Sequence, residues 1–335
     1  MAAPVTAGMP ALRLPEGAAP GRRVVGSGGS ATVYRVAAPG GACAVKVLHG
    51  RLASSSWHAQ RFLEEAALLA RFRGDGVPEF VATATWDGRP ALLYRYVPGL
   101  PLHRFAAAGG GRLAPLTAIE IGVALLNVLC RLHQHPQAVV HGDLTAENLI
   151  LDRGHRVWVV DFGSARSVDD AAPPGPPAVK PRWLSPEQAR GEPWAPASDL
   201  YQAGLVLYRL LAGRHANPGQ TPAQARVMAA NPPALDLRGI HPALRAFLAR
   251  TLDPRPERRW SSARACRDAL QWLHAELHER LPRGGNRTPV AVAGAKTPLP
   301  AVPTSAPRQS PPGPPGDPHR HQGESETCIP ETPPS

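Results

Sequence analysis

Three polar side chains in the middle of the chain have the types and spacing that phosphoryl transfer requires. Asp143 and Asn148 belong to the run HGDLTAEN, and Asp161 opens the run DFG eighteen residues after Asp143. Phosphoryl transfer depends mainly on positioning and charge neutralisation, so it needs oxygen ligands for Mg²⁺ and a carboxylate near the attacking hydroxyl. Asn148 and Asp161 fit the metal-ligand role, and Asp143 fits the carboxylate role. The order and spacing of the two runs argue against chance.

A second pair of charged residues, Lys46 and Glu65, lies earlier in the chain. Lys46 stands at the centre of an apolar strand pattern, where an unpaired ammonium group is very costly. Glu65 shares its predicted helical face with Phe62, Leu69 and Phe72, which places this carboxylate on the buried stripe. We therefore expect a Lys46–Glu65 ion pair that holds the inner phosphates of a nucleotide. For this region in isolation, a purely structural buried pair is the alternative.

A glycine-rich segment, GSGGS at residues 26–30, precedes Lys46 between two strand patterns. Small residues let backbone N–H groups approach nucleotide phosphates that larger side chains would block. A run of this kind is by itself more often a flexible loop. Its strand–turn–strand setting argues against a dinucleotide-binding fingerprint, which requires a helix next.

The elements that must position these residues fall into two groups. Before residue 98 the pattern is strand-like, with one helix that begins at the serines 54–56 and ends before Gly74. The predicted strands cover residues 22–25, 31–36, 43–48, 79–86 and 91–97, the last two joined by an Asp87-Gly88 turn. The later helical patterns cover residues 116–134, 199–213, 241–252 and 262–281. We expect an α+β fold with a small antiparallel-sheet N-lobe carrying one helix and a larger, mainly helical C-lobe.

Composition separates a folded body from two ends. Of the 335 residues, 43% are apolar, which is enough for a sizeable core, while many of the 40 prolines lie near the C-terminus. Residues 1–19 are expected to form a flexible arm, and residues 281–335 a disordered proline-rich tail. The run PPGPP at 311–315 could bind an SH3-like regulator, and a plain linker is the alternative.

Charge and cysteine usage narrow the classes of partner and compartment. The net charge of +11 favours acidic partners, but no basic stripe with interleaved aromatics occurs, so nucleic acid is not expected to bind. The four cysteines are far apart, which argues against a disulfide framework and fits a reducing compartment. No signal-peptide pattern and no apolar run of roughly 20 residues is apparent. We expect a cytoplasmic protein without a membrane partner.

These motifs together resemble those of the bacterial Ser/Thr branch of the eukaryotic-like protein kinases. The likeness extends over about residues 20–280 and includes LSPEQARG at 184–191 and SDLY at 198–201. It implies a kinase domain at 20–280, with the N-lobe at 20–97 and the C-lobe at 98–280. It also implies that Asp199 holds the catalytic loop through its backbone, and that Glu187 pairs with Arg259.

The resemblance assigns roles to the site residues. Lys46 and Glu65 would orient ATP, Asp143 would accept the hydroxyl proton, and Asn148 with Asp161 would hold Mg²⁺, with Mn²⁺ as an alternative. Tyr94 would be the gatekeeper, and the backbone of residues 95–97 would bind adenine. The implied nucleotide-binding residues are Gly26, Gly28, Val33, Ala44, Lys46, Tyr94, Arg95, Val97 and Ile150.

The sequence departs from the family pattern at Gly142, where most members have the arginine of His-Arg-Asp. In the family that arginine receives a phosphorylated activation loop, so a glycine of this non-RD type predicts little need for loop phosphorylation. The loop agrees, because Ser164 and Ser167 are the only hydroxyl residues between Gly163 and Trp183.

Two further departures are Thr145, where Ser/Thr kinases place a lysine, and Lys180, where they place a threonine. One hypothesis is that the two residues have exchanged roles, so that Lys180 reaches the transferring phosphate while Thr145 bonds Asp143. The alternative is that Thr145 is merely tolerated and Lys180 is a solvated loop charge.

The function expected from the sequence is ATP- and Mg²⁺-dependent phosphorylation of Ser or Thr in protein substrates. A pseudokinase that acts as a nucleotide-binding or scaffolding module is one alternative, favoured by the changes at Gly142, Thr145 and Lys180. The retained set of Lys46, Glu65 and the three motif residues argues against it. A small-molecule phosphotransferase is the other alternative, and such enzymes lack the LSPEQARG segment.

Overall fold

The computed structural model describes residues 23–38, 40–72, 74, 76–168 and 180–280. Contacts divide the chain into two units, residues 1–287 and 288–335, and the described residues all belong to the first. The predicted arm at 1–19 and the predicted tail at 281–335, with its PPGPP run, lie outside the described residues.

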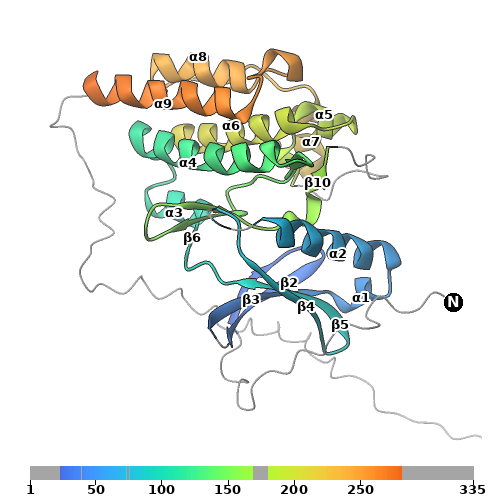
Figure 1. Cartoon of the computed structure of the whole chain (residues 1–335). Helices are drawn as coiled ribbons and strands as arrows, with labels where there is room; N and C mark the ends of the chain where they lie inside the picture. Colours follow the sequence, from blue (N-terminus) through green and yellow to red (C-terminus); the bar gives the residue numbers. More distant parts are fainter. Residues whose placement is uncertain (1–22, 39, 73, 75, 169–179, 281–335) are drawn as a thin grey trace, which may run out of the picture. The chain divides into compact units, whose positions relative to one another are not determined.

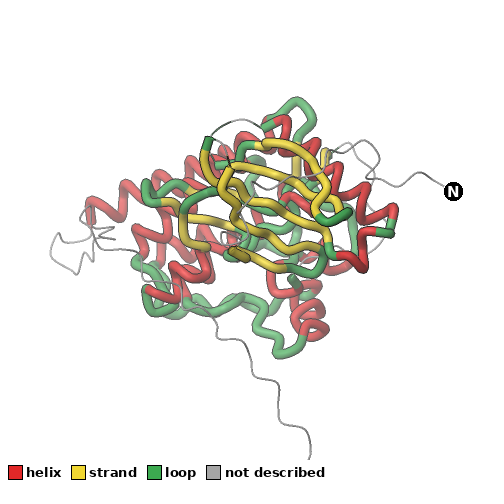
Figure 2. The backbone as a smooth tube through the Cα atoms, turned by 90° about the horizontal axis from the view of Figure 1, so that it is seen from below, coloured by secondary structure: helices red, strands yellow, loops and turns green. Residues whose placement is uncertain are grey.

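A five-stranded antiparallel sheet forms the N-lobe (Figures 1 and 2). In spatial order β1-β2-β3-β5-β4 its strands are β1 (Arg23–Ser27), β2 (Ala31–Ala38), β3 (Gly41–Leu48), β5 (Arg89–Arg95) and β4 (Phe80–Trp86). The central strand β3 is buried from Cys43 to Leu48, as its apolar run predicts. In this register Lys46 lies opposite Val33 on β2 and Leu92 on β5. The strand order therefore places Lys46 in the middle of the sheet.

Local sequence signals set the turns and the helix of this lobe. Asp87 and Gly88 both have positive φ, 50° and 71°, which fits the tight β4–β5 hairpin that this pair predicts. The short α1 (Gly50–Ala53) precedes α2 (Ser56–Arg71), and the side chain of the N-cap residue Ser55 accepts a hydrogen bond from the His58 amide. The predicted start of the long helix at residues 54–56 is thus confirmed, whereas α1 was not predicted.

The C-lobe is mainly helical. Its helices are α3 (Leu102–Ala108), α4 (Pro115–Gln134), α5 (Pro186–Arg190), α6 (Pro196–Ala212), α7 (Pro222–Ala230), α8 (Pro242–Thr251) and α9 (Ala263–Arg280). Each helix from α4 to α8 begins with proline, whose fixed φ and missing N–H suit the first helical position. The four long helices match the predicted segments. The short helices α3, α5 and α7 were not predicted.

Helix α4 forms the centre of this lobe and corrects one expectation from the sequence. It contains an 18-residue window with a mean hydropathy of 1.6, and the helix is long and apolar enough to cross a membrane, although no such run was expected. In the structure half of this stretch is buried, and α4 packs against α6 and α9. A Cβ at Gly122 would lie 2.9 Å from the Leu270 side chain, so this glycine permits the close approach of α4 and α9. Such burial is the behaviour of a core helix.

Short strands and turns present the polar motifs. β6 (Gly99–Pro101), β8 (Leu149–Asp152) and β9 (Val157–Val159) form a three-stranded sheet, and β7 (Val139–Val140) pairs with β10 (Arg166–Ser167). The remaining short elements are the 3₁₀ turns η2 (Phe162–Ser164), η3 (Pro181–Trp183) and η4 (Pro256–Arg258). Asp143 follows β7, Asn148 precedes β8 and Asp161 follows β9. Because β8 and β9 pair with Leu149 opposite Val159, Asn148 and Asp161 emerge at the same end of this sheet, and Asp143 is held next to Asn148 by a hydrogen bond.

Candidate active site

The ammonium group of Lys46 joins two carboxylates that come from different parts of the chain. Lys46 Nζ lies 2.8 and 2.6 Å from the two carboxylate oxygens of Glu65 on α2, and 2.7 Å from Asp161 Oδ1. Lys46 and Glu65 are almost fully buried, while the Asp161 side chain is about half exposed. The predicted Lys46–Glu65 pair is present, and the same cation also binds the DFG aspartate.

Burial and charge shift the protonation equilibria of this cluster. Burial by itself lowers the pKa of Lys46, but the negative charges of Asp161 and Glu65 outweigh it and raise the pKa above its usual value. The charge of Lys46 lowers the pKa of Asp161 below its usual value. Burial raises the pKa of Glu65, an effect that Lys46 opposes. Lys46 is therefore a permanent cation, and Asp161 remains ionised.

Asp143 and Asn148 are in direct contact. Asn148 Nδ2 donates to both the backbone oxygen and Oδ2 of Asp143, each at 2.9 Å. The second carboxylate oxygen, Asp143 Oδ1, is buried and has no hydrogen-bond partner among the described residues. Burial and the charge of Asp161 raise the pKa of Asp143 to about 8. One oxygen of this carboxylate is thus left available for an incoming group.

The backbone of the catalytic loop is anchored by Asp199 on α6. Its carboxylate accepts the amides of His141 at 2.9 Å and Gly142 at 2.8 Å, and it also contacts His133 Nε2 at 2.9 Å. Asp199 is fully buried. The predicted role of Asp199 in holding this loop is confirmed by these contacts.

Two glutamine amides bind the same loop, and neither was singled out from the sequence. The backbone oxygen of Gly142 accepts hydrogen bonds from Gln188 Nε2 at 2.8 Å and Gln202 Nε2 at 3.1 Å. Gln202 Oε1 accepts the Leu144 amide at 3.0 Å, and Gln202 Nε2 also reaches the backbone oxygen of Trp183 at 3.1 Å. No periodicity or motif spacing identifies these amides, because their partners are backbone atoms.

Thr145 and Lys180 have partners other than those of the exchange hypothesis. The Thr145 hydroxyl accepts the Asn148 amide at 3.3 Å, and no hydrogen bond of the described residues joins it to Asp143. Lys180 Nζ lies 3.4 Å from Glu147 Oε2, and the charge of Lys180 also opposes the rise in the pKa of Asp143. Lys180 is thus close enough to act on the site electrostatically, whereas the Thr145 part of the hypothesis does not match this arrangement.

The glycine-rich segment connects β1 and β2. A Cβ placed on Gly26, Gly28 or Gly29 would meet nothing within 4 Å, so these glycines leave open space beside their backbone. The Gly28 amide donates to the Ala31 oxygen at 3.0 Å, and Arg51 Nη2 donates to the Gly29 oxygen at 2.7 Å. The turn is therefore fixed at its base and unobstructed alongside its glycines.

The other predicted nucleotide-binding residues lie on β2, β3, β5, β8 and the segment after β5. Ala44 is opposite Tyr94 in the sheet, and Ile150 is opposite Trp158. Burial raises the pKa of Tyr94, and Lys46, Glu65 and Asp161 all act on it electrostatically, so the tyrosine is near the ion cluster. The Arg95 amide donates to the Glu79 oxygen at 2.8 Å, and Val97 is buried.

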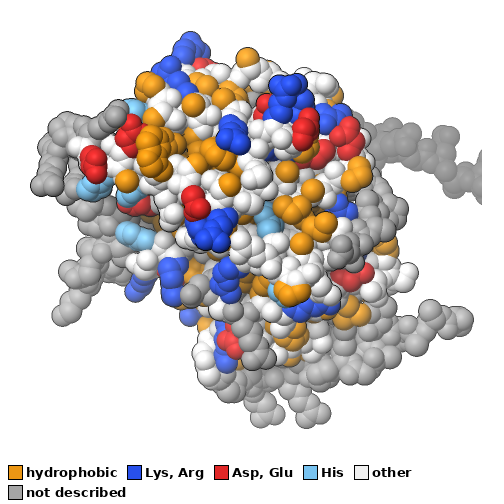
Figure 3. Space-filling model, turned by 45° about the horizontal axis from the view of Figure 1, so that its top comes forward, with side chains coloured by type: hydrophobic (Ala, Val, Ile, Leu, Met, Phe, Trp, Pro, Cys, Tyr) orange, Lys and Arg blue, Asp and Glu red, His pale blue; other side chains and the backbone are white. Residues whose placement is uncertain are grey.

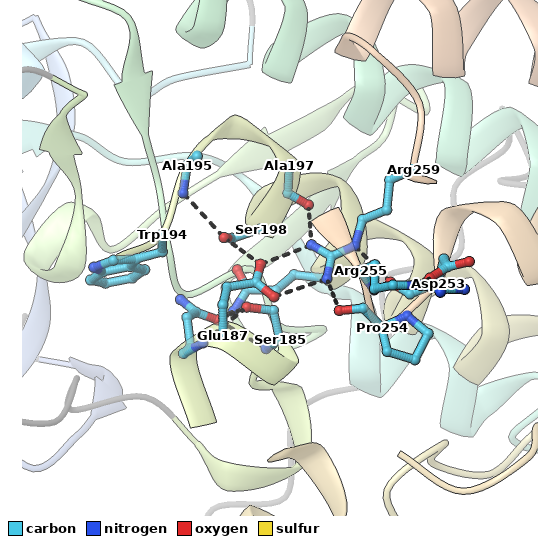
Figure 4. A network of polar contacts seen from close by, with 12 residues as sticks. Ser185, Glu187, Trp194, Ala195, Ala197, Ser198, Asp253, Pro254, Arg255 and Arg259 are labelled. Atoms are coloured by element: carbon cyan, nitrogen blue, oxygen red, sulfur yellow. Dashed lines mark hydrogen bonds and ion pairs between the residues drawn. The ribbon is translucent and has the colours of Figure 1, made fainter. Parts of the chain in front are cut away.

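A buried ion pair stabilises the segment that follows η3 (Figure 4). Arg259 Nη1 and Nη2 donate to the two carboxylate oxygens of Glu187, each at 2.8 Å. Ser198 Oγ donates to the same carboxylate at 2.6 Å, while backbone oxygens of Asp253, Pro254 and Ala197 accept the remaining Arg259 hydrogens. Burial raises the pKa of Glu187, but Arg259 outweighs it and holds the pKa below its usual value. The predicted choice of Arg259 as the partner is confirmed.

Comparisons with known proteins agree with this arrangement. Residues 21–272 match the model of the protein kinase domain. The chain is 32% identical over 290 residues to the serine/threonine-protein kinase pkn2 of Myxococcus xanthus, covering 81% of this chain and 34% of the relative. It is 30% identical to the serine/threonine-protein kinase PknB of Mycolicibacterium smegmatis over 243 residues (69% and 38%).

A third relative is the DNA damage-responsive serine/threonine-protein kinase RqkA of Deinococcus radiodurans, 30% identical over 272 residues, which covers 78% of this chain and 37% of the relative. The chain spans little more than a third of the length of these relatives. The domain match covers most of the chain and coincides with the bilobal fold and with the ion cluster of Lys46, Glu65 and Asp161. The chain belongs to the protein kinase domain family.

Proposed function

We propose that the protein is an active serine/threonine-protein kinase that uses ATP and a divalent cation. The observation that carries the proposal is the buried, unpartnered Oδ1 of Asp143 beside the Lys46–Glu65–Asp161 cluster. A pseudokinase has no chemical need for a carboxylate oxygen kept without a partner, because such an atom costs free energy.

Each residue has a defined role in the proposed reaction. Lys46, held by Glu65, binds the inner phosphates of ATP. The hydroxyl oxygen of the substrate attacks the γ-phosphorus, the bond from that phosphorus to the bridging oxygen breaks, and ADP leaves. Asp143 accepts the hydroxyl proton at its unpartnered Oδ1.

The residues present are compatible with a bound metal ion. The amide nitrogen of Asn148 donates to Asp143, which leaves the amide oxygen for a metal ion. The lowered pKa of Asp161 keeps that carboxylate ionised. We propose that Asn148 and Asp161 hold Mg²⁺, which prefers oxygen ligands and is commonly shared with substrate phosphates. The bound ion would neutralise charge on the phosphates.

The bounds of the domain, the type of substrate and the compartment are further proposals. We propose a kinase domain at residues 20–280 that acts on Ser or Thr of protein substrates in the cytoplasm, where ATP is present. The buried free thiols of Cys43, Cys130 and Cys266 fit a reducing compartment. Figure 3 shows basic side chains dispersed among acidic and apolar ones on the face it draws, so no nucleic-acid partner is proposed.

The tail residues are proposed as targets and as a docking segment. Thr288, Thr297, Ser310 and Thr332 each precede proline and lie outside the described residues. We propose that the kinase phosphorylates some of these hydroxyls and that a regulator binds the proline-rich tail. Mass spectrometry after incubation with ATP tests the first part, since an unmodified tail would contradict it.

The experiment that tests the function is transfer of radiolabelled phosphate from ATP with Mg²⁺. The purified chain and its Asp161→Asn variant are each incubated alone and with a generic basic protein. We expect label on Ser or Thr with the parent and none with the variant. Nucleotide binding without any transfer by the parent would contradict an active kinase and favour the pseudokinase.

A further inference from the structure

The side-chain position of Gly142 is occupied by a tryptophan from another part of the chain. Gly142 has a φ of +73°, and a Cβ there would lie 2.0 Å from Cζ3 of Trp194 and 2.7 Å from two further ring atoms. Trp194 is buried in the segment between α5 and α6. Only glycine is compatible with both this backbone conformation and this ring contact.

Trp194 is in turn held by Arg166. The Arg166 guanidinium carbon lies 4.8 Å from the centre of the Trp194 ring, and Arg166 Nη2 donates to the Trp194 backbone oxygen at 2.7 Å. Arg166 is 6% exposed, so this contact is made largely out of water, where a cation over an aromatic ring is most favourable. One arginine thus fixes both the ring and the backbone of Trp194.

Both ends of this stack lead to the catalytic loop. Arg166 lies on β10, opposite Val140 of β7, and β7 continues directly into His141 and Gly142. The ring of Trp194 contacts Gly142 itself. The Gly142–Trp194–Arg166 stack therefore closes a ring of contacts between the loop that carries Asp143, the residues after the DFG run and the segment that precedes α6.

We propose that Trp194 and Arg166 are positioning residues that hold the catalytic loop in its working conformation. Trp194 packs on Gly142, and the buried Arg166 cation holds Trp194 in place. This inference rests on the proposed kinase function and deepens it. The stack supplies, from within the chain, the link that an arginine at position 142 and a phosphate would otherwise form. A permanent contact at position 142 thus takes the place of a contact that would depend on phosphorylation of the activation loop.

The test compares Trp194→Ala with Trp272→Ala, a matched change of an exposed tryptophan on α9. We expect Trp194→Ala to lower kcat for phosphoryl transfer by about 10²-fold, because a small displacement of Asp143 is costly. The KM for ATP should stay within about twofold, since Lys46 and Glu65 are not touched. Trp194→Phe, which keeps a ring over Arg166, should recover most of the rate, and Trp272→Ala should match the parent.

Hydrogen exchange over residues 139–148 gives a second readout that does not depend on activity. Trp194→Ala should exchange faster there than the parent, whereas Trp272→Ala should not. If Trp194→Ala does not fold, Arg166→Lys gives the same test with the charge retained. Unchanged exchange in Trp194→Ala, or a Trp194→Phe variant no better than Trp194→Ala, overturns the inference. If the parent chain has no transfer activity, the proposed function is overturned. The hydrogen-exchange measurement still tests whether the stack holds the catalytic loop.

Discussion

Arg259 places both terminal nitrogens on the two carboxylate oxygens of Glu187, in a setting where their side chains are 0% and 3% exposed. The Arg259 guanidinium also lies 4.7 Å from the ring centre of Tyr201. Removing one partner of such a pair leaves an uncompensated buried charge, which costs more than the pair itself contributes. The pair is therefore a sensitive point of the C-lobe.

Arg259→Ala should destabilise the fold. We expect the free energy of unfolding to fall by about 3–5 kcal/mol, because Glu187 would remain buried without its cation. Arg258→Ala changes the exposed neighbour and should stay within about 0.5 kcal/mol of the parent. Urea unfolding of the three proteins measures both values. Equal losses in the two variants would contradict the assignment of Arg259.

The same pair predicts a pH dependence of stability. The pKa of Glu187 is held below its ordinary value of 4.5, so the unfolded chain takes up this proton first as the pH falls. The stabilisation is present above pH 4.5 and is lost as the pH drops through the lowered value. Glu187→Gln should be less stable than the parent at pH 7, and the difference should shrink below pH 4.5. Urea unfolding at several pH values measures this difference in the free energy of unfolding. If the difference stays constant from pH 7 to pH 3, the Glu187 carboxylate does not titrate in this way.

Lys180→Ala separates the two interpretations of this loop lysine. Lys180 lies beside Glu147, and its charge opposes the rise that burial causes in the pKa of Asp143. Its charge therefore acts at the site, and we expect it to stabilise negative charge on the transferring phosphate. Its loss should reduce the transfer rate by about 10²-fold, the usual effect of removing one such group. Lys180→Arg, which keeps the charge, should retain more activity. A Lys180→Ala variant as fast as the parent would identify a solvated loop charge.

Phosphatase treatment should leave the transfer rate unchanged. Ser164 and Ser167 are the only hydroxyl residues between Gly163 and Trp183, and Ser167 is 7% exposed and donates to the Gln137 oxygen at 2.6 Å. A hydroxyl held in this way is a poor phosphate acceptor. Ser164→Ala should also stay within about twofold of the parent rate. Intact mass and rate measurements before and after phosphatase check the prediction, and a rate that falls with the loss of phosphate would refute it.

Residues whose roles depend on local sequence could be predicted. The periodicity around Glu65 places it on the buried face of α2, and the structure puts it on Lys46. The HGD and DFG runs each adjoin an apolar strand, so their polar groups had to emerge where strands end. The turn at Asp87-Gly88 was equally local, because its backbone conformation is encoded by the two turn residues.

Contacts that depend on the path of the chain could not be predicted. Trp194 lies on Gly142 because of how the segment between α5 and α6 returns to the catalytic loop, and nothing in the spacing of these residues records it. Gln202 binds backbone atoms of two loops, which leaves no pairing pattern in the sequence. The exchange hypothesis paired Thr145 with Asp143, whereas the Thr145 hydroxyl accepts the amide of Asn148.

The packing of Trp194 on Gly142 also constrains how this chain can evolve. A single change to arginine at position 142 would bring a side chain into the volume of the indole ring, and loss of Trp194 alone would leave a cavity over a glycine. Each single step is therefore disfavoured, although the double replacement removes the collision. The two positions therefore form a unit, and an arginine at position 142 requires a change at Trp194 as well.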